Sequence, residues 1–528
     1  MTLTDPQART KGPTLSELDE GDRYERFSLL QQRLPEVWAD MRHDYGDESV
    51  VVVPSVSLDG AMPHSGVVMQ AMEERALFLL LLLRQPRLRM IYVTSMPVSE
   101  DVVAYYLALL PGVIPSHLRA RLTLVSVGDS SPRPLSVKLL ERPRVLARIA
   151  GLVPTAARSH LIPYNTTALE RDVALSLGIP MYGADPRLAS LGGKTGCRRL
   201  FADVGVPHPL GEEDLHALDD VTDAVVRMRA ARPAIAEVIV KLNDGVSGQG
   251  NALVDLRDLP APGDEDERAE VGTRVRAMQL ESAELPFETY VAAFERGGGI
   301  VEERLLGEEL RSPSVQFRAL PDGSVELLST HDQLLGGASG QSYLGCVFPA
   351  DLAYSRTITD HATVIAERLA QLGVLGRFAV DFVVVRDESG GWAAYAIELN
   401  LRKGGTTHPF LTLQYLTDGA YDGAAGLFRT PGGDSRFLVA TDHLEAEQLK
   451  GLVVADLFDI VARRGLHFDQ GRQTGVVFHM MSCLTESGRL GLTAVGSTRD
   501  EAWQLYHDAE SALLAEGELA LREGAVPG

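Results

Sequence analysis

The chain is poor in cysteine and in positive charge for its size. Its 528 residues include three cysteines, Cys197, Cys346 and Cys483. These lie far apart without CxxC spacing, so we expect neither a disulfide framework nor a zinc site. The sequence carries 72 acidic against 50 basic residues, a net charge of −22. This charge repels phosphate backbones, so nucleic acid is not expected as a partner.

Long apolar runs are also lacking. The leucine run Leu79–Leu83 is too short to cross a bilayer and is followed at once by Arg84. The first residues, MTLTDPQARTKGPTLSELDEGDR, are polar and have no apolar core of a signal peptide. We therefore expect a cytoplasmic protein with no membrane partner.

The length and composition predict several ordinary globular domains. A hydrophobic content of 45% and a charged content of 23% are typical of such chains. After a polar arm with a helix at about Leu29–Met41, strands alternate with helices, which predicts a parallel α/β domain. No GxGxxG follows its first strand, so a dinucleotide site has little support. The predicted strands are Val50–Val53, Met90–Thr94, Leu122–Val127 and His160–Pro163, and the helices are Gln70–Leu83 and Glu100–Leu109.

A β-hairpin with acidic residues is expected within residues 376–409, GRFAVDFVVVRDESGGWAAYAIELNLRKGGTTHP. Two apolar runs, Phe378–Val385 and Trp392–Leu399, flank a DESGG turn. Asp381 interrupts the first run. Glu398 and Asn400 end the second and lie two apart, which directs both side chains to one face. The three side chains therefore converge.

Oxygen ligands of this kind suit a hard cation such as Mg²⁺. Arg402, Lys403 and the pair Gly404-Gly405 follow directly and would hold an anionic substrate or transition state. Turn chemistry at a solvated edge explains any one of these residues as well. An unpaired Asp381 in an apolar strand would be costly, however, which favours the metal site.

Two lysines upstream are candidates for binding phosphate. Lys194 begins a predicted helix that ends near Ala202, and its ammonium and the helix dipole together would meet a phosphate. A solvated lysine in a first helical turn is the alternative. The segment Gly193-Lys194-Thr195 resembles the end of a P-loop, but Leu188 stands where that motif needs glycine.

Lys241 follows a strand at Val238–Val240 and precedes the loop Asn243–Asn251. Glycines in this loop allow backbone N–H groups to approach phosphate oxygens, and Lys241 would neutralise their charge. A simple hairpin loop explains the same pattern. The candidate residues of the loop are Gly245, Ser247, Gly248 and Gly250.

The run Gly299–Leu306 is expected to be a strand that leads to a linker. Backbone groups there would bind an adenine edge, and a downstream acid would bind ribose hydroxyls. A charged surface strand accounts for the same residues. The last part of the chain, with apolar stretches at Gly451–Ala462 and Gly475–Cys483 and a helix from about Thr498, predicts a small α+β domain.

The order of these pieces resembles the ATP-grasp superfamily over roughly residues 186–430. More narrowly, IELNLRKGGTTHPF after an α/β domain resembles the pheganomycin-type peptide ligases. The resemblance implies an α/β and α+β multidomain fold. Its expected parts are an arm (1–45), a pre-ATP-grasp parallel α/β domain (46–185), an ATP-grasp domain (186–435) and an α+β C-terminal extension (436–528).

The resemblance also implies a role for each candidate residue. Glu302 competes with Glu303 for the adenine contact, as Glu308 does with Glu309 for the ribose. The implied contacts are Lys194, Lys241 and the glycine loop with the ATP phosphates, the main chain of Glu302, Glu303 and Leu305 with adenine, Glu309 with ribose, Asp381, Glu398 and Asn400 with Mg²⁺, and Arg402 and Lys241 with the reacting groups.

The implied function is an ATP-dependent carboxylate–amine (peptide) ligase in natural-product biosynthesis. It would form an acyl phosphate, release ADP and phosphate, and join a small carboxylate to an amino acid or peptide amine. The sequence leaves undecided whether the chain forms a homodimer. An ATP-grasp small-molecule kinase and a non-catalytic nucleotide-binding protein are the alternatives. The intact metal set disfavours the binding protein, and Arg402 with its glycine pair favours the ligase over the kinase.

Overall fold

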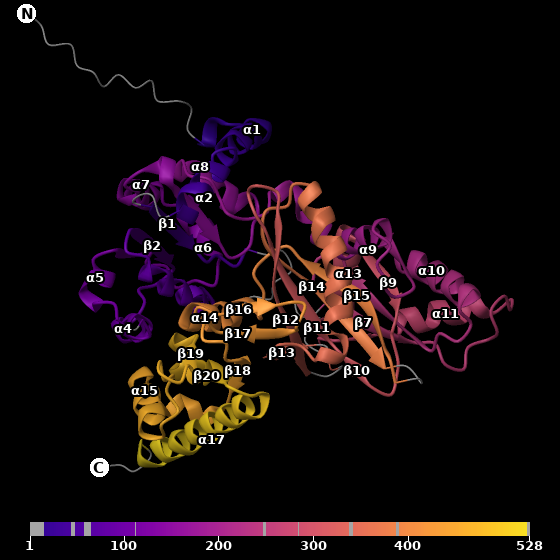
Figure 1. Ribbon diagram of the computed structural model, residues 1–528. Coiled ribbons are helices and arrows are strands. Elements are labelled where there is room, and N and C mark those ends of the chain that lie inside the picture. The colour runs from indigo at the N-terminus through magenta and orange to yellow at the C-terminus, as the bar shows by residue number, and fades with distance from the viewer. Residues whose placement is uncertain are drawn as a thin grey trace, which may run out of the picture.

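The structure is a computed structural model of the chain. It describes residues 15–43, 48–57, 65–110, 112–245, 250–282, 285–336, 340, 342–386 and 390–524. Figure 1 shows the N-terminal part beside the central sheets, with the C-terminal part below it.

The N-terminal part is built on a parallel four-stranded sheet of order β3-β2-β1-β4. The central strand β1 (Glu48–Val53) is buried along its whole length. That burial explains its run of four valines, because helices cover both faces of such a sheet. The other strands are β2 (Leu88–Thr94), β3 (Leu122–Ser126) and β4 (Ser159–Pro163), and the helices are α3 (Gly66–Glu74), α4 (Glu100–Ala108), α5 (Pro115–Arg119), α6 (Leu135–Leu140), α7 (Pro143–Leu152) and α8 (Ala168–Leu177).

Two helices predicted as single segments are each divided. The helix expected at Leu29–Met41 is instead α1 (Glu20–Gln31) followed by α2 (Leu34–His43). Pro35 lies in the first turn of α2, where a missing N–H is tolerated but an uninterrupted helix is not. The segment expected at Gln70–Leu83 begins as α3 and continues as the 3₁₀-helix η2 (Arg75–Arg84). No proline or glycine lies at this second change.

A five-stranded antiparallel sheet follows, in the order β5-β9-β6-β7-β8. Its buried face packs on α10 (Leu218–Ala231), α11 (Glu267–Arg276) and α12 (Phe287–Gly297). Helices α10 and α11 lie at the right of Figure 1. Helix α9 (Lys194–Asp203) precedes the sheet in the chain. The strands are β5 (Gly211–Leu215), β6 (Glu237–Leu242), β7 (Asn251–Asp255), β8 (Gln279–Leu280) and β9 (Gly299–Glu303).

The largest sheet has nine strands in the described residues, and its inner strands pack on helix α13 (Leu352–Gln371). The predicted hairpin forms here as β14 (Gly376–Arg386) and β15 (Trp392–Asn400). The other strands before the C-terminal region are β10 (Leu310–Arg311), β11 (Pro313–Ala319), β12 (Val325–Gly336) and β13 (Ser342–Phe348).

The C-terminal region extends this same sheet. Strand β18 (Phe437–Glu445) pairs with β13, and β20 (Arg489–Gly496) then joins β18 to β19 (Gly475–His479). Helices α15 (Val454–Arg463) and α17 (Arg499–Gly524) cover it. The region therefore takes part in the central sheet and does not form a sheet of its own.

Helix α14 (Thr407–Thr417) lies where the three parts meet. Its buried side chains share one apolar core with η2, β1, β2 and the C-terminal strands. Within the described residues, no helix is long and apolar enough to cross a membrane.

Candidate functional site

The hairpin brings its three polar side chains together. In the β14–β15 register Asp381 lies opposite Glu398, and a bulge follows directly after Asp381. The Asn400 amide Nδ2 donates to Asp381 Oδ2 at 3.0 Å. The alternation of side chains along β15 therefore places Glu398 and Asn400 on the face of Asp381, as the sequence predicted.

The two carboxylates share one partly buried space and influence one another. Burial, followed by the negative charge of Glu398, raises the pKa of Asp381 to about 6. For Glu398, burial raises the pKa, but the Lys194 ammonium at 2.8 Å from its Oε1 outweighs burial and lowers the pKa overall. Glu398 thus keeps its charge, and the cost of the close acid pair falls on Asp381.

These three side chains fit a hard cation by their chemistry. Two carboxylates and an amide oxygen are ligands that Mg²⁺ accepts, and a cation would relieve the repulsion that raises the pKa of Asp381. In the described part of the chain, no three or more histidine, cysteine, aspartate or glutamate side chains cluster to hold a metal. A cation here would therefore depend on Asn400 and on substrate oxygens for its remaining ligands. The metal assignment stays a prediction.

Helix α9 begins at Lys194, as predicted, but its first amide groups are already bonded. The backbone N–H of Lys194 donates to the carbonyl of Asn243 at 3.1 Å, and that of Thr195 donates to Asn243 Oδ1 at 2.9 Å. These two N–H groups are therefore not free for a phosphate, and the contact of this helix start with a phosphate stays a prediction. The side chain of Lys194 is directed to the acidic hairpin instead.

Lys241 lies on β6 beside a buried acid of the neighbouring strand β9. Its ammonium donates to Glu302 Oε1, and Arg198 Nη1 lies 3.2 Å from Glu302 Oε2. The adjacent Glu303 points to the opposite face, where it binds Arg232 and accepts from the backbone N–H of Leu210. Alternation along β9 thus separates the two competing glutamates, and Glu302 lies on the side of Lys241.

The linker after β9 contains the remaining nucleotide candidates. Leu305 is half-buried, whereas Glu308 is exposed. The carboxylate of Glu309 lies 2.6 Å from Arg311 and 3.1 Å from Arg386. A ribose contact by Glu309 would compete with both arginines and remains a prediction.

A cavity of about 180 Å³ collects most of the candidates. Lys194, Gly245, Glu398, Asn400 and Arg402 line it, on loops and strand ends of the central part. A helix start, a glycine loop and the end of a hairpin therefore meet in one place. Lys241, Gly250, Glu302, Glu303, Leu305, Glu309 and Asp381 are not among its lining residues.

The N-terminal part supplies a wall of this cavity that the sequence analysis did not single out. Asn165, Thr166 and Thr167 follow β4 and line the cavity together with Asp185. Their signal was available, since ligands often bind at the carboxyl ends of strands in a parallel sheet. Asn243 was also missed, although it follows Lys241 by two residues.

The candidate glycines lie in two segments, the loop after Lys241 and the pair Gly404-Gly405. Gly250 accepts from the backbone N–H of Leu242 at 2.9 Å, but Ser247 and Gly248 lie outside the described residues. At Gly405 a Cβ atom would come within 2.5 Å of the Tyr343 ring, so glycine is required for this close approach. Gly405 therefore has a packing reason, whereas a Cβ atom at Gly404 would meet nothing within 4 Å.

Two family patterns match the chain. The family described as "IQCH-like, ATP-grasp" matches residues 186–281 and 275–424. The family described as "PGM1 C-terminal domain" matches residues 456–509.

Two curated relatives extend this likeness. An L-propargylglycine--L-glutamate ligase of Streptantibioticus cattleyicolor is 30% identical over 84% of this chain and 89% of its own length. The IQ motif-containing protein H of Danio rerio is 24% identical over 75% of this chain, which spans 42% of that longer protein.

Solved structures share the fold at low identity. The ADP complex of an N5-carboxyaminoimidazole ribonucleotide synthetase gives a TM-score of 0.50 at 11% identity, over 90% of this chain and 98% of that one. A biotin carboxylase from Campylobacter jejuni gives 0.51 at 13% identity, over 89% and 95%. The chain belongs to the ATP-grasp family. Within that family it is a ligase.

Proposed function

We propose that this chain is an ATP-dependent carboxylate–amine ligase that forms an amide bond and releases ADP and phosphate. One observation carries the proposal. Lys194, Glu398, Asn400 and Arg402 line one cavity, and Asp381 faces Glu398 across the hairpin. The name of the relative from S. cattleyicolor, which joins two amino acids, supports a carboxylate and an amine as substrates.

The residues present suit the charges of such a reaction. Asp381, Glu398 and Asn400 would hold Mg²⁺, which when bound neutralises charge on the ATP phosphates. Lys194 and Lys241 would exchange their present partners, Glu398 and Glu302, for phosphate oxygens. Arg402 follows Asn400 by two residues and would stabilise negative oxygen at the reacting carboxylate.

The reaction would then proceed in two steps. A carboxylate oxygen attacks the γ-phosphorus, and the bond from phosphorus to the bridging oxygen breaks, so that ADP leaves and an acyl phosphate remains. The amine nitrogen next attacks the acyl carbon. The carbon–nitrogen bond forms, phosphate leaves, and the amine gives up a proton. The nucleophile is an amino acid or peptide amine, in keeping with a role in peptide natural-product biosynthesis.

The test uses purified protein, ATP and Mg²⁺ with pools of amino acids and peptides. Mass spectrometry should detect condensation products, and chromatography should detect ADP with phosphate. Hydroxylamine should intercept the acyl phosphate as a hydroxamate when the amine is omitted. AMP with pyrophosphate during confirmed ligation would refute the acyl-phosphate route. Phosphorylated hydroxyl compounds as the only products would replace the ligase with a kinase.

A further inference from the structure

A second and larger cavity, of about 370 Å³, lies between the N-terminal sheet, η2, α14 and the ends of β11, β12 and β14. Its volume falls in the range of small-molecule sites. No residue lines both this cavity and the candidate nucleotide cavity, although the two are neighbours, because Arg402 lines the smaller one and Lys403 the larger.

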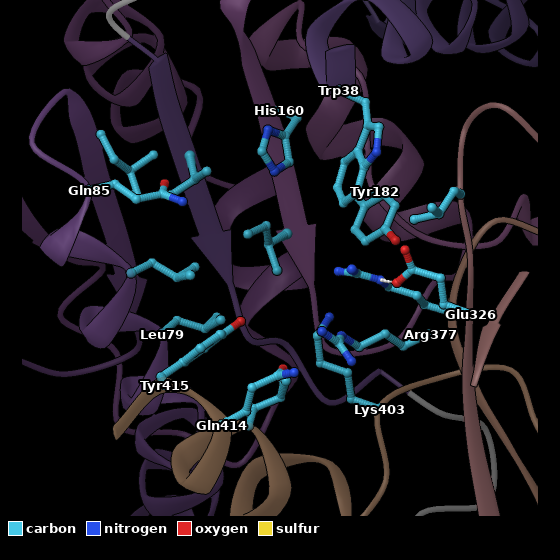
Figure 2. A pocket seen from close by; sticks show the side chains of 17 residues that line it. Trp38, Leu79, Gln85, His160, Tyr182, Glu326, Arg377, Lys403, Gln414 and Tyr415 are labelled. Carbon is cyan, nitrogen blue, oxygen red and sulfur yellow. Dashed lines mark hydrogen bonds and ion pairs between the residues drawn. The ribbon is translucent and has the colours of Figure 1, made fainter. Parts of the chain in front are cut away.

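Most of the cavity wall is apolar or aromatic. Leu79 and Gln85 face Tyr182 and Arg377 across the space in Figure 2, with Trp38 and His160 at one end. Trp38 stacks on Tyr182 with the ring centroids 5.1 Å apart and the planes at 19°. Further leucines from η2 and α14 complete the wall. Such a lining accepts an apolar or aromatic body.

The charges around the cavity do not balance. Glu326 is the one acid that lines it among the described residues, and Arg318 binds that acid at 2.5 Å. Arg377 and Lys403 also line the cavity, and no carboxylate of the described residues forms an ion pair with either. Among these residues, the Lys403 ammonium donates to a backbone carbonyl, that of Pro163.

Arg377 in particular has unused donors. No hydrogen bond or ion pair joins its side chain to any described residue, and its buried Nη1 has no partner. Burial lowers the pKa of Arg377. Burial, and then the charge of Arg377, lowers the pKa of Lys403 to about 7. Burial is the largest cause of both shifts, and the raising effect of Glu326 on the pKa of Arg377 does not offset it.

Two other residues of the wall each have a buried polar atom without a hydrogen-bond partner among the described residues. The Trp38 indole nitrogen, which can only donate, is buried without a hydrogen-bond partner among the described residues. His160 Nδ1 also lacks a partner there, but burial lowers the pKa of this ring to about 4, so the nitrogen donates or accepts according to the tautomer. Buried donors without partners are uncommon and costly. The described residues therefore offer the indole nitrogen of Trp38 no acceptor.

We propose that this cavity binds a small molecule with one carboxylate on an apolar or aromatic body. A planar carboxylate matches the guanidinium of Arg377, which can donate two parallel N–H bonds, and Lys403 lies beside it. One free guanidinium among apolar walls favours a monocarboxylate over a phosphate, which needs more donors. This inference does not rest on the ligase reaction, because it concerns binding at a separate cavity.

The test measures binding of three matched probes: 3-phenylpropionate, 3-phenylpropanol and 3-phenylpropylamine. Trp38 is one of three tryptophans in the chain and lines the cavity, so its fluorescence should report occupancy. The acid should change the fluorescence and raise the melting temperature, whereas the alcohol and the amine should do neither at equal concentration. Trp38→Phe should remove the fluorescence signal but keep the thermal shift.

Variants locate the binding. Arg377→Met should weaken binding of 3-phenylpropionate about tenfold or more, since a charge-assisted pair is lost. Arg356→Met is the matched control, because Arg356 is 81% exposed on α13 and should leave binding unchanged. Gln414→Phe, which fills the cavity and keeps the guanidinium, should also weaken binding if Arg377→Met fails to fold.

Saturating ATP should not displace the acid, because the nucleotide is expected at the smaller cavity. Equal binding of all three probes, or of the acid to wild type and Arg377→Met alike, would overturn the proposal. Displacement of the acid by sodium acetate at equal concentration would do so too, since the apolar wall would then contribute nothing. The binding experiments do not depend on ligase activity, so they test this proposal even if the ligase assay detects no product.

Discussion

The two cavities of this chain handle charge in opposite ways. In the smaller one Lys194 is paired with Glu398, and nearby Lys241 is paired with Glu302. In the larger one Arg377 and Lys403 form no ion pair with an acid in the part of the chain that the structure describes. The lysines at the smaller cavity are therefore neutralised by acids of the chain itself, whereas the two cations at the larger cavity are not.

The two ways of arranging charge suit two different kinds of ligand. A site for a triphosphate and a metal cation needs both positive and negative side chains. When these side chains pair with each other, the pairing offsets part of the cost of burying their charges. A site for a single anion needs only a cation, which costs stability wherever the anion is not bound. The comparison can be tested by changing one charge at a time in each cavity.

The largest expected effect is on turnover at the smaller cavity. Asp381→Asn and Glu398→Gln should each lower kcat by roughly 10²–10³-fold or more, because each removes negative charge from the proposed cation site. Steady-state ADP release with a confirmed substrate pair measures this. Asp360→Asn, at an acid that is 69% exposed, is the matched control. Full activity of either variant at saturating Mg²⁺ would remove the metal assignment.

A smaller effect is expected on nucleotide binding. Lys241→Ala should weaken ATP binding about tenfold, since one cation would no longer reach the phosphates. Calorimetry with a non-hydrolysable ATP analogue provides the measurement. Lys450→Ala, at an ion pair on the surface of the C-terminal region, should bind as wild type does. If ATP affinity and turnover were unchanged in Lys241→Ala, the lysine would not contact the nucleotide and its role would be limited to the ion pair with Glu302.

Stability should respond with opposite signs in the two cavities. Lys194→Met leaves Glu398 without its partner and should lower the free energy of unfolding by about 1–3 kcal/mol, less than a fully buried pair would lose because Glu398 is 26% exposed. Arg377→Met removes an unpaired cation and should leave that free energy unchanged or raise it by about 1 kcal/mol. Denaturant unfolding compares them. If both variants lost the same free energy of unfolding, the proposed difference in charge pairing between the two cavities would be wrong.

The smallest effect concerns pH. The pKa of Lys403 in the folded chain is about 7, so between pH 7 and its ordinary value the unfolded chain binds a proton that the folded chain does not. Stability should therefore rise with pH in this window, by about 1 kcal/mol because the ammonium is only half-buried. The pKa of Lys194 is raised, so its contribution is lost only at still higher pH. Lys403→Met should flatten the slope, and an unaltered slope would contradict the lowered pKa.

Local features of the candidate site could be predicted from the sequence. Apolar runs around DESGG gave the hairpin of β14 and β15, and the two-residue spacing gave the shared face of Glu398 and Asn400. The start of α9 at Lys194 followed from its pattern as well. These features depend on backbone hydrogen bonding and side-chain alternation over a few residues, which the sequence displays directly.

Other features required the folded chain. The bond from the Lys194 ammonium to Glu398 joins residues about 200 positions apart, and Asn243 caps α9 from a different loop. The addition of β18–β20 to the central sheet was likewise not visible in a pattern that predicted a small α+β domain.

The second cavity shows the same division most clearly. The sequence by itself determined that Trp38, His160, Arg377 and Lys403 exist at these positions, and it supplied the strands and helices that carry them. Only the tertiary structure decided that they surround one space without an acid for Arg377 and Lys403. The physical reason is that packing between distant segments sets burial and charge pairing, and burial and charge pairing determine what a side chain can bind.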